Sequence, residues 1–218
     1  MPRLRHPHGG CRGEGALPGQ GAVTDRKDAP AKAPPGPGTP GPGGISVLGI
    51  GNVLMLDDAF GPYVVRVLDA SYEFPGTVSL VDAGTPGHDM TLHVEGRDAL
   101  IVVDAVRAAG PPGELRLYPL EEVLRRPPTQ VTSPHEPGLK DALLRLRFTG
   151  GAPGEGTLVG VIPKDVETGV GLSAPVRAAV PKAVREVLSL LRGRGIEVRE
   201  RVPPARPDIW WEPGGGGA

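Results

Sequence analysis

The stretch from Asp98 to Val106 reads DALIVVDAV, and it decides the fold. Every residue from Ala99 to Val103 is apolar, so a strand built from them has no face to turn toward water. Strands buried on both faces occur in parallel sheets that helices cover on either side. The stretch therefore predicts the central strand of an open α/β sheet, with Asp104 at its carboxyl end.

The neighbouring segments alternate between strand and helix patterns. Strands are predicted for the apolar runs ISVLGI (45–50), TVSLVDAG (77–84) and GTLVGVIP (156–163), and a weaker one for ELRLYPL (114–120). Apolar residues recur at helical spacing in GPYVVRVLDASY (61–72), EPGLKDALLRLRF (136–148) and SAPVRAAVPKAVREVLSLLRGRG (173–195). This order is typical of a three-layer α/β fold, in which an open, twisted, mostly parallel sheet carries helices on both faces.

Two of the predicted helices show further signals. In 136–148 the side chains Leu139, Leu143, Leu144 and Leu146 are expected to form the apolar face. The helix that follows Ser173 is expected to use this serine as its N-cap and to end at Gly193 or Gly195.

Both ends of the chain differ in composition from its middle. Residues 1–44 are rich in Gly and Pro and cannot form an apolar face, so they are expected to be a flexible tail. The folded domain is expected at 45–202, with a flexible C-terminal tail at 203–218. In that tail, Trp210 and Trp211 either pack back on the domain or bind a partner.

Composition excludes several kinds of partner. The net charge of -1 and the 4% aromatic content argue against nucleic acid, which is usually bound by a basic, aromatic surface. No apolar run approaches the roughly 20 residues needed to cross a bilayer, so a cytoplasmic protein without a membrane partner is expected. The single cysteine, Cys11, lies in the N-terminal tail, so a bound metal would need histidine and carboxylate ligands.

Acidic residues follow each of the first three predicted strands. They are Asp57 with Asp58, then Asp82, then Asp104, and His135 opens a later helix. Since ligands bind outside the carboxyl ends of such strands, these side chains are expected to collect at one edge and to share a cation. One imidazole with carboxylates suits nickel or zinc better than calcium. Taken singly, Asp82 and Asp104 could instead cap helices, His135 could bond a backbone carbonyl, and Asp57 could be solvated.

Other enzymatic templates do not fit the sequence. Gly49 and Gly51 resemble the start of a dinucleotide fingerprint, but Leu54 stands where its third glycine belongs. Gly51 is instead expected to let the loop turn sharply. No Gly-x-Ser-x-Gly elbow and no His-Glu-x-x-His helix is present, and His88 and His93 have no matching ligands nearby.

Five blocks of this sequence resemble, in the same order, the signature blocks of the hydrogenase maturation proteases. They are GIGNVLMLDDAFG, VDAGTPG, LIVVDAV, SPHEPGLKDAL and LVGVIPKDVETGVGLS, and the resemblance covers residues 45–198. The family consists of endopeptidases that process the large subunits of nickel-iron hydrogenases. The resemblance therefore implies removal of a short C-terminal extension from a large-subunit precursor after nickel insertion.

The resemblance also implies roles for individual residues. The family's metal-binding residues fall on Asp58, Asp104 and His135, and a further acid falls on Asp82. Many members carry glutamate where this chain has Asp58, so Asp57 could share the work. Nickel would arrive with the precursor, held by its cysteine thiolates, and serve recognition, catalysis or both, with water activated by a carboxylate or by the metal.

Two other functions stay open at this point. A metal-binding chaperone could hold the immature subunit without cutting it and use the same acidic edge. A small-molecule metallohydrolase on the same fold is a third interpretation, although the glycine-rich ETGVGLS loop favours an open groove over a closed pocket.

Overall fold

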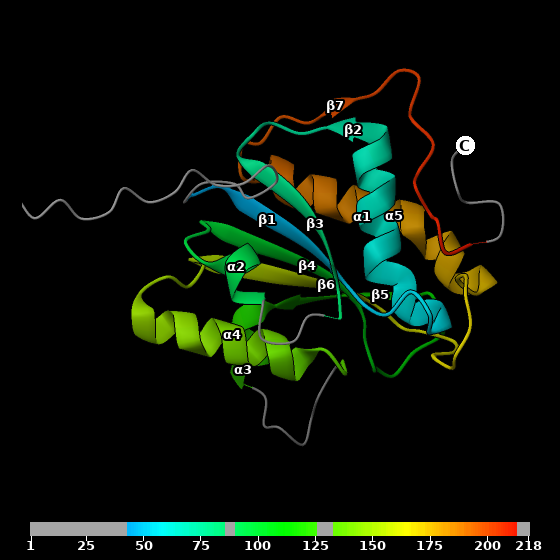
Figure 1. Cartoon of the computed structure of the whole chain (residues 1–218), viewed down its shortest axis with the longest axis horizontal. Helices are drawn as coiled ribbons and strands as arrows, with labels where there is room; N and C mark the ends of the chain where they lie inside the picture. Colours follow the sequence, from blue (N-terminus) through cyan, green and yellow to red (C-terminus); the bar gives the residue numbers. More distant parts are fainter. Residues whose placement is uncertain (1–42, 86–89, 126–132, 213–218) are drawn as a thin grey trace, which may run out of the picture. The chain divides into compact units, whose positions relative to one another are not determined.

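A five-stranded sheet forms the centre of the protein. The computed structural model describes residues 43–85, 90–125 and 133–212. The strands are β1 (Ile45–Ile50), β3 (Val78–Gly84), β4 (Ala99–Ala105), β5 (Leu115–Pro119) and β6 (Glu155–Val161), in the spatial order β3-β1-β4-β6-β5 (Figure 1). β5 is antiparallel to β6, and the other neighbours are parallel. The predicted mostly parallel α/β sheet is confirmed.

The stretch that predicted the fold lies in the middle of this sheet. β4 has β1 on one side and β6 on the other, and all seven of its residues are buried. Asp104 stands opposite Gly160 of β6, near the carboxyl end of the strand. Helices exclude water from both faces of this central strand, which explains why residues 99–103 are all apolar.

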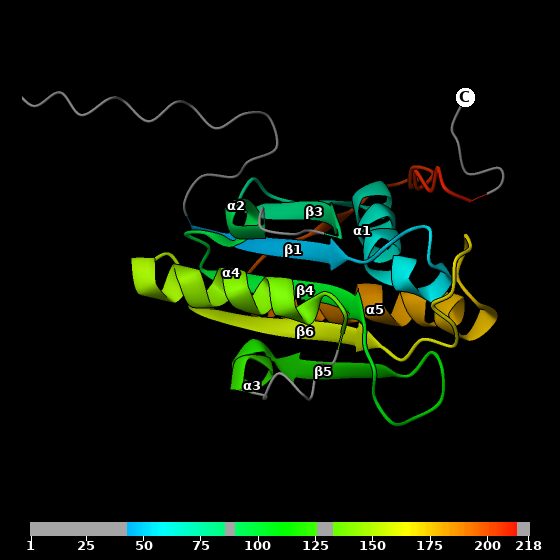
Figure 2. The ribbon, with the colours of Figure 1, turned by 60° about the horizontal axis from the view of Figure 1, so that its bottom comes forward.

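Helices cover the two faces of the sheet in separate groups (Figure 2). One core cluster joins α1 (Phe60–Ser71) and α5 (Ala174–Arg192) to one set of strand residues, including Ile45, Val47, Ile101 and Val103. The other joins α2 (Thr91–Val94), α3 (Leu120–Arg125) and α4 (Glu136–Thr149) to Leu48, Ile50, Leu100 and Val102. Alternate strand residues thus belong to opposite cores, as the period of a strand requires.

Smaller elements complete the fold. A 3-10 helix, η1 (Leu56–Ala59), connects the loop after β1 to α1. A two-stranded ribbon pairs β2 (Tyr72–Glu73) with β7 (Arg199–Glu200). No helix within the described ranges is long and apolar enough to cross a membrane.

The predicted helix ends agree with the structure, while one residue of the predicted apolar face does not. Ser173 is the N-cap of α5, and Gly193 follows its last residue. In α4 the side chain of Leu144 is 40% exposed, whereas Ala142 is buried. The prediction for Leu144 is wrong. The helical period places Ala142, and not Leu144, on the buried face with Leu139 and Leu146.

The C-terminal segment runs over the domain as far as Glu212. Ile209 and Trp211 are each 6% exposed, whereas Trp210 is 58% exposed. Of the paired tryptophans, the second therefore packs against the protein. The predicted N-terminal tail falls outside the described residues except for Gly43 and Gly44, and the predicted C-terminal tail does so from 213 onward.

Candidate active site

A sharp turn after β1 places two aspartates beneath the surface. Gly51 has a φ of +145°, and a Cβ there would lie 1.8 Å from the carbonyl oxygen of Asp58. Any other residue would force this turn open, because glycine alone adopts the conformation without strain and leaves the space free. The chain then enters η1, in which Asp57 is 0% and Asp58 3% exposed.

Asp58 meets His135, which directly precedes α4. The imidazole Nε2 lies 3.1 Å from Oδ2 and 3.2 Å from Oδ1 of Asp58. The backbone N–H of Asn52 donates to Oδ2 of the same carboxylate at 2.8 Å. The loop after β1 and the start of α4, distant in sequence, therefore form one contact.

Asp104 joins this pair through a serine. The backbone N–H of Ala105 donates to its Oδ1 at 2.8 Å, and the hydroxyl of Ser133 donates to its Oδ2. The same hydroxyl accepts a hydrogen bond from the backbone N–H of His135 at 3.0 Å. Ser133, which is 2% exposed, thus orients Asp104 and the entry to α4 together.

Burial and neighbouring charges shift the pKa values of Asp104 and His135. Burial raises the pKa of Asp104 to about 7, and the charge of Asp58 acts in the same direction against the attraction of His135. Burial lowers the pKa of His135, but its hydrogen bond to Asp58 and the charges of both aspartates outweigh this and raise it. Asp104 can therefore exchange a proton near neutral pH, and the environment of His135 favours its protonated form.

The three side chains can approach one cation. One ligand atom from each of Asp58, Asp104 and His135 lies within 4.8 Å of the other two. Two carboxylates and one imidazole are ligands that borderline divalent metals accept, and a cation would relieve the repulsion between the carboxylates. The donor set therefore fits a divalent transition metal.

Two of these three side chains line a cavity of about 280 Å³ with mostly apolar walls. Asp58 and His135 lie in its lining, together with Met55, Val106, Pro134, Pro163 and Val166. Apolar walls strengthen electrostatic interactions, because little water screens the charges. A peptide and a metal bound here would meet the Asp58 carboxylate in a weakly screened environment.

Asp57 has a different role from its neighbour. Its Oδ2 accepts hydrogen bonds from the backbone N–H groups of Lys164 and Asp165 and from the hydroxyl of Ser173, at 2.8, 3.1 and 2.8 Å. Its Oδ1 accepts from the backbone N–H of Ser173 at 2.7 Å. The idea that Asp57 could share the metal with Asp58 is wrong, since these donors occupy both oxygens and tie η1 to the start of α5.

Asp82 lies apart from the three grouped residues. Near the end of β3, it accepts hydrogen bonds from Nε and Nη2 of Arg66 at 3.2 and 3.0 Å. It also accepts from the backbone N–H of Gly84 at 3.3 Å. The guanidinium compensates its charge, so Asp82 positions the end of β3, and a catalytic role for it stays a prediction.

The remaining candidate residues lie away from the cluster or outside the described ranges. His93 belongs to α2, and His88 and Cys11 fall outside the described residues. Ser133 was not among the predicted site residues, although a hydroxyl two positions before His135 was a usable signal. Asn52 contributes its backbone N–H, which no side-chain pattern reveals.

Comparison with known proteins places the chain in a family. The family model described as "Hydrogenase maturation protease" matches residues 62–190. The chain belongs to this family. This confirms the family that the sequence blocks resemble, and the protein is accordingly a hydrolase that acts as a peptidase.

Curated relatives and solved structures agree with this assignment. The Hydrogenase 2 maturation protease of Escherichia coli (strain K12) is 40% identical over 158 residues, which are 72% of this chain and 96% of the relative. The hydrogenase expression/formation protein HoxM of Azotobacter vinelandii is also 40% identical over 158 residues, 72% of this chain and 76% of the relative. The structure of the hydrogenase maturating endopeptidase HybD from E. coli matches with a TM-score of 0.68 and 39% identity, covering 73% of this chain and 99% of that one.

Proposed function

We propose that this maturation protease removes the C-terminal extension of a nickel-iron hydrogenase large-subunit precursor after nickel insertion, in the cytoplasm. The family supports the processing of a hydrogenase precursor, and the site supports the use of nickel that the precursor itself carries. In this proposal nickel is part of the substrate and not a resident cofactor. No nucleic acid or membrane partner is required.

The observation that carries the proposal is the approach of Asp58, Asp104 and His135 to one another, with Asp58 and His135 in the lining of a mostly apolar cavity. None of the described residues is a cysteine, and among the described lining residues of this cavity the one hydroxyl is that of Thr85, whereas His135 is hydrogen-bonded to Asp58. Peptide cleavage at this position is therefore best served by water and not by a side-chain nucleophile.

The residues of the chain divide the work. Asp58 and His135, which face the cavity, would bind the precursor's metal and thereby fix the scissile bond beside them. Asp104 is held by Ala105 and Ser133 and has a pKa of about 7, so it can both ligate a cation and take up a proton. Water that attacks the peptide carbonyl must lose a proton. A carboxylate acting as general base, or the precursor's metal acting as Lewis acid, would promote that loss.

A non-cleaving chaperone would use the same ligands, so the test must detect a broken bond. Purified nickel-loaded precursor is incubated with the protein, and the product is weighed by mass spectrometry. We expect the precursor to lose the mass of its C-terminal extension. A stable complex of unchanged mass would favour the chaperone.

Nickel dependence is tested with the same assay. Precursor without nickel should resist cleavage by intact protease, and nickel added to the free protease beforehand should not restore it. Equal cleavage of nickel-free precursor in the presence of a chelator would contradict recognition through nickel.

A further inference from the structure

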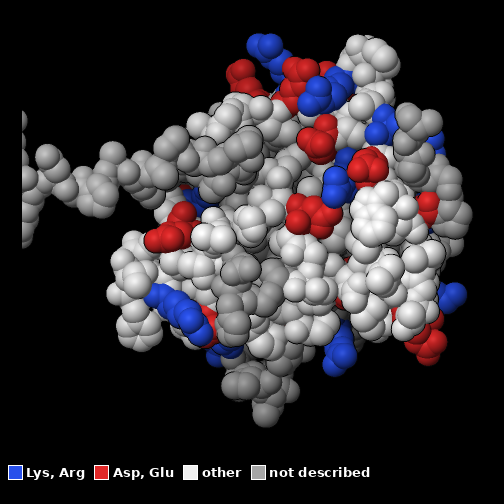
Figure 3. All heavy atoms as spheres, in the orientation of Figure 1, with Lys and Arg blue, Asp and Glu red and all other residues white. Residues whose placement is uncertain are grey.

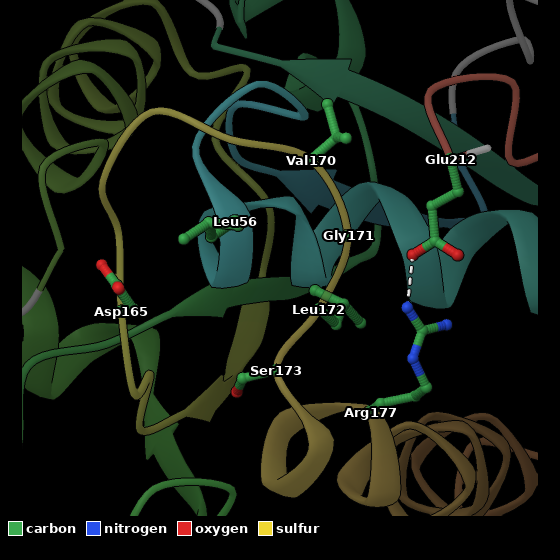
Figure 4. A pocket seen from close by; sticks show the side chains of 8 residues that line it. All are labelled: Leu56, Asp165, Val170, Gly171, Leu172, Ser173, Arg177 and Glu212. Atoms are coloured by element: carbon green, nitrogen blue, oxygen red, sulfur yellow. Dashed lines mark hydrogen bonds and ion pairs between the residues drawn. The ribbon is translucent and has the colours of Figure 1, made fainter.

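A second cavity, of about 340 Å³, lies beside the candidate active site. Its lining includes Leu56, Asp165, Leu172 and Arg177, and Glu212 from the C-terminal segment (Figure 4). Glu212 lies beyond residues 62–190, which the family model matches. Part of this cavity is therefore built by a segment outside the matched region.

Two adjoining loops separate this cavity from the one that contains Asp58 and His135. Met55 lines the first cavity and Leu56 the second, and in the facing loop Val166 and Asp165 are divided in the same way. A β-bridge joins Met55 to Gly169, and the N–H of Leu56 donates to the carbonyl of Gly169 at 3.1 Å. A peptide that crosses this loop pair can thus occupy both cavities.

The loop pair exposes apolar side chains along that route. Leu54 is 53%, Val166 37% and Val170 45% exposed. Apolar side chains gathered at the rim of a site are typical of surfaces that bind a protein segment. Val166 borders the first cavity and Val170 the second, so the apolar surface is continuous with the candidate active site.

The charges of the second cavity favour a cation. Arg177 donates to Glu212 at 2.6 Å and to the hydroxyl of Tyr63 at 2.8 Å, and its guanidinium lies 5.4 Å from the centre of the Tyr63 ring. Its charge is therefore compensated within the protein, and an anionic ligand would gain little from it. With Asp165 included, the charged lining residues carry one net negative charge. Leu56 and Leu172 belong to the apolar part of the lining.

A glycine keeps the space in front of the Arg177–Glu212 pair open. Figure 4 shows the backbone at Gly171 running past these two side chains, which point toward each other. A Cβ on Gly171 would lie 3.5 Å from Oε1 of Glu212 and 3.7 Å from Nη2 of Arg177. A larger residue here would narrow the cavity beside its charged wall.

We propose that this second cavity is a substrate subsite that takes a lysine or arginine side chain of the precursor. The alkyl part of that side chain packs on Leu56 and Leu172, and its charge faces Asp165 and Glu212. The neighbouring main chain of the precursor crosses Leu54, Val166 and Val170 to reach the metal-binding residues. This assignment rests on the proposed function.

The first test compares processing kinetics of nickel-loaded precursor by Glu212→Gln and by the parent. Loss of one negative charge should raise KM about threefold and leave kcat unchanged. A factor of about three corresponds to the loss of one partly exposed ion pair. Glu155→Gln is the matched control, because Glu155 also pairs with an arginine, Arg194, at 2.8 Å but lies at the opposite end of the sheet. Its KM should equal that of the parent.

A second pair of variants tests the apolar route. Val170→Asn should raise KM by a similar factor, whereas Val202→Asn, at a valine that is 89% exposed near β7, should not. Unchanged KM in both Glu212→Gln and Val170→Asn would overturn the subsite.

Variants of the precursor identify the side chain that occupies the subsite. Each lysine and arginine near the cleaved bond is replaced by glutamine, and one of these changes should raise KM without adding to the effect of Glu212→Gln. Additive effects for all of them would contradict a basic occupant. If the parent binds the precursor but does not cleave it, the proposed activity fails separately, and the same comparison is made with Kd; equal Kd values would overturn the subsite.

Discussion

Asp57 and Asp58 are neighbours in the chain, and both are buried, yet they serve two different regions of the molecule. Asp57 accepts four hydrogen bonds, all from residues 164, 165 and 173. Asp58 accepts one backbone hydrogen bond, from Asn52, and otherwise faces His135 and the cavity. One carboxylate connects parts of the fold, and the other is available to a ligand.

The comparison shows that the donors around a buried carboxylate distinguish its role better than burial does. A carboxylate whose oxygens are fully engaged by protein donors is stabilised as an anion and has no capacity for a metal. Asp58 retains that capacity because few donors occupy it. Burial alone would have assigned the same role to both residues.

The largest effects on activity are expected on the side of Asp58. Asp104→Asn and His135→Ala should each lower processing by more than about a hundredfold, since even the loss of a residue that supports a ligand costs 10–100-fold. The fold should be retained, because neither side chain is part of the apolar core, although Asp104→Asn should also alter the pH dependence of stability. Rates on nickel-loaded precursor, with urea unfolding as the control, check this; strong activity in either variant would break the assignment.

The largest effect on stability is expected on the side of Asp57. Asp57→Asn should lower the free energy of unfolding by about 2 to 4 kcal/mol, because an amide brings N–H donors against the donors at 164, 165 and 173. Asp141→Asn is the control, since Asp141 pairs with Arg145 on the exposed side of α4 and should cost about 0.5 kcal/mol or less. Equal stability of the two variants in urea would refute the connecting role of Asp57.

A smaller effect is expected at Ser133, which joins Asp104 to the start of α4. Ser133→Ala should reduce kcat by roughly 10- to 100-fold through loss of orientation, with the fold retained. The free Asp104 carboxyl also loses a donor, so its pKa should rise and the pH profile of kcat should move upward. An unchanged profile would show that Ser133 has no influence on Asp104.

The smallest effect concerns the pH dependence of stability without metal. The folded protein keeps a proton on Asp104 up to a pH of about 7, whereas the unfolded chain releases it near 3.8. Folding therefore takes up a proton between these values, and stability should fall as the pH rises from about 4 to about 7. The raised pKa of His135 acts in the same direction, but only as the pH rises above its ordinary value of 6.5.

Asp104→Asn should remove part of this fall. Urea midpoints with a chelator, measured across that pH range, should show the variant gaining on the parent as the pH rises. Parallel curves would mean that Asp104 titrates normally in the folded state.

Much of the fold followed from local sequence, as did the expectation that acidic side chains and one histidine meet at one edge of the sheet. The choice of Asp58, Asp104 and His135 among them rested on the family resemblance. The apolar run of β4 required burial on both faces, and strands in one sheet bring their carboxyl ends together, which placed Asp58 and Asp104 at one edge. His135 followed from its position at the start of a helix. These inferences succeed because each depends only on the spacing of apolar residues and on the order of strands along the chain.

Other features depend on contacts between distant residues. Asp57 could not be separated from Asp58, because its donors lie more than a hundred residues away and three of them are backbone N–H groups. The pairing of Asp82 with Arg66 across α1 and β3, and that of Glu212 with Arg177, likewise required the tertiary structure.

The most direct test compares Asp58→Asn with Asp58→Glu on nickel-loaded precursor. The glutamate keeps the charge and adds one methylene, so it should retain processing, whereas the asparagine should lose most of it while unfolding at the same urea concentration as the parent. Equal processing by Asp58→Asn and the parent would contradict the account and leave Asp58, like Asp57, with a structural role.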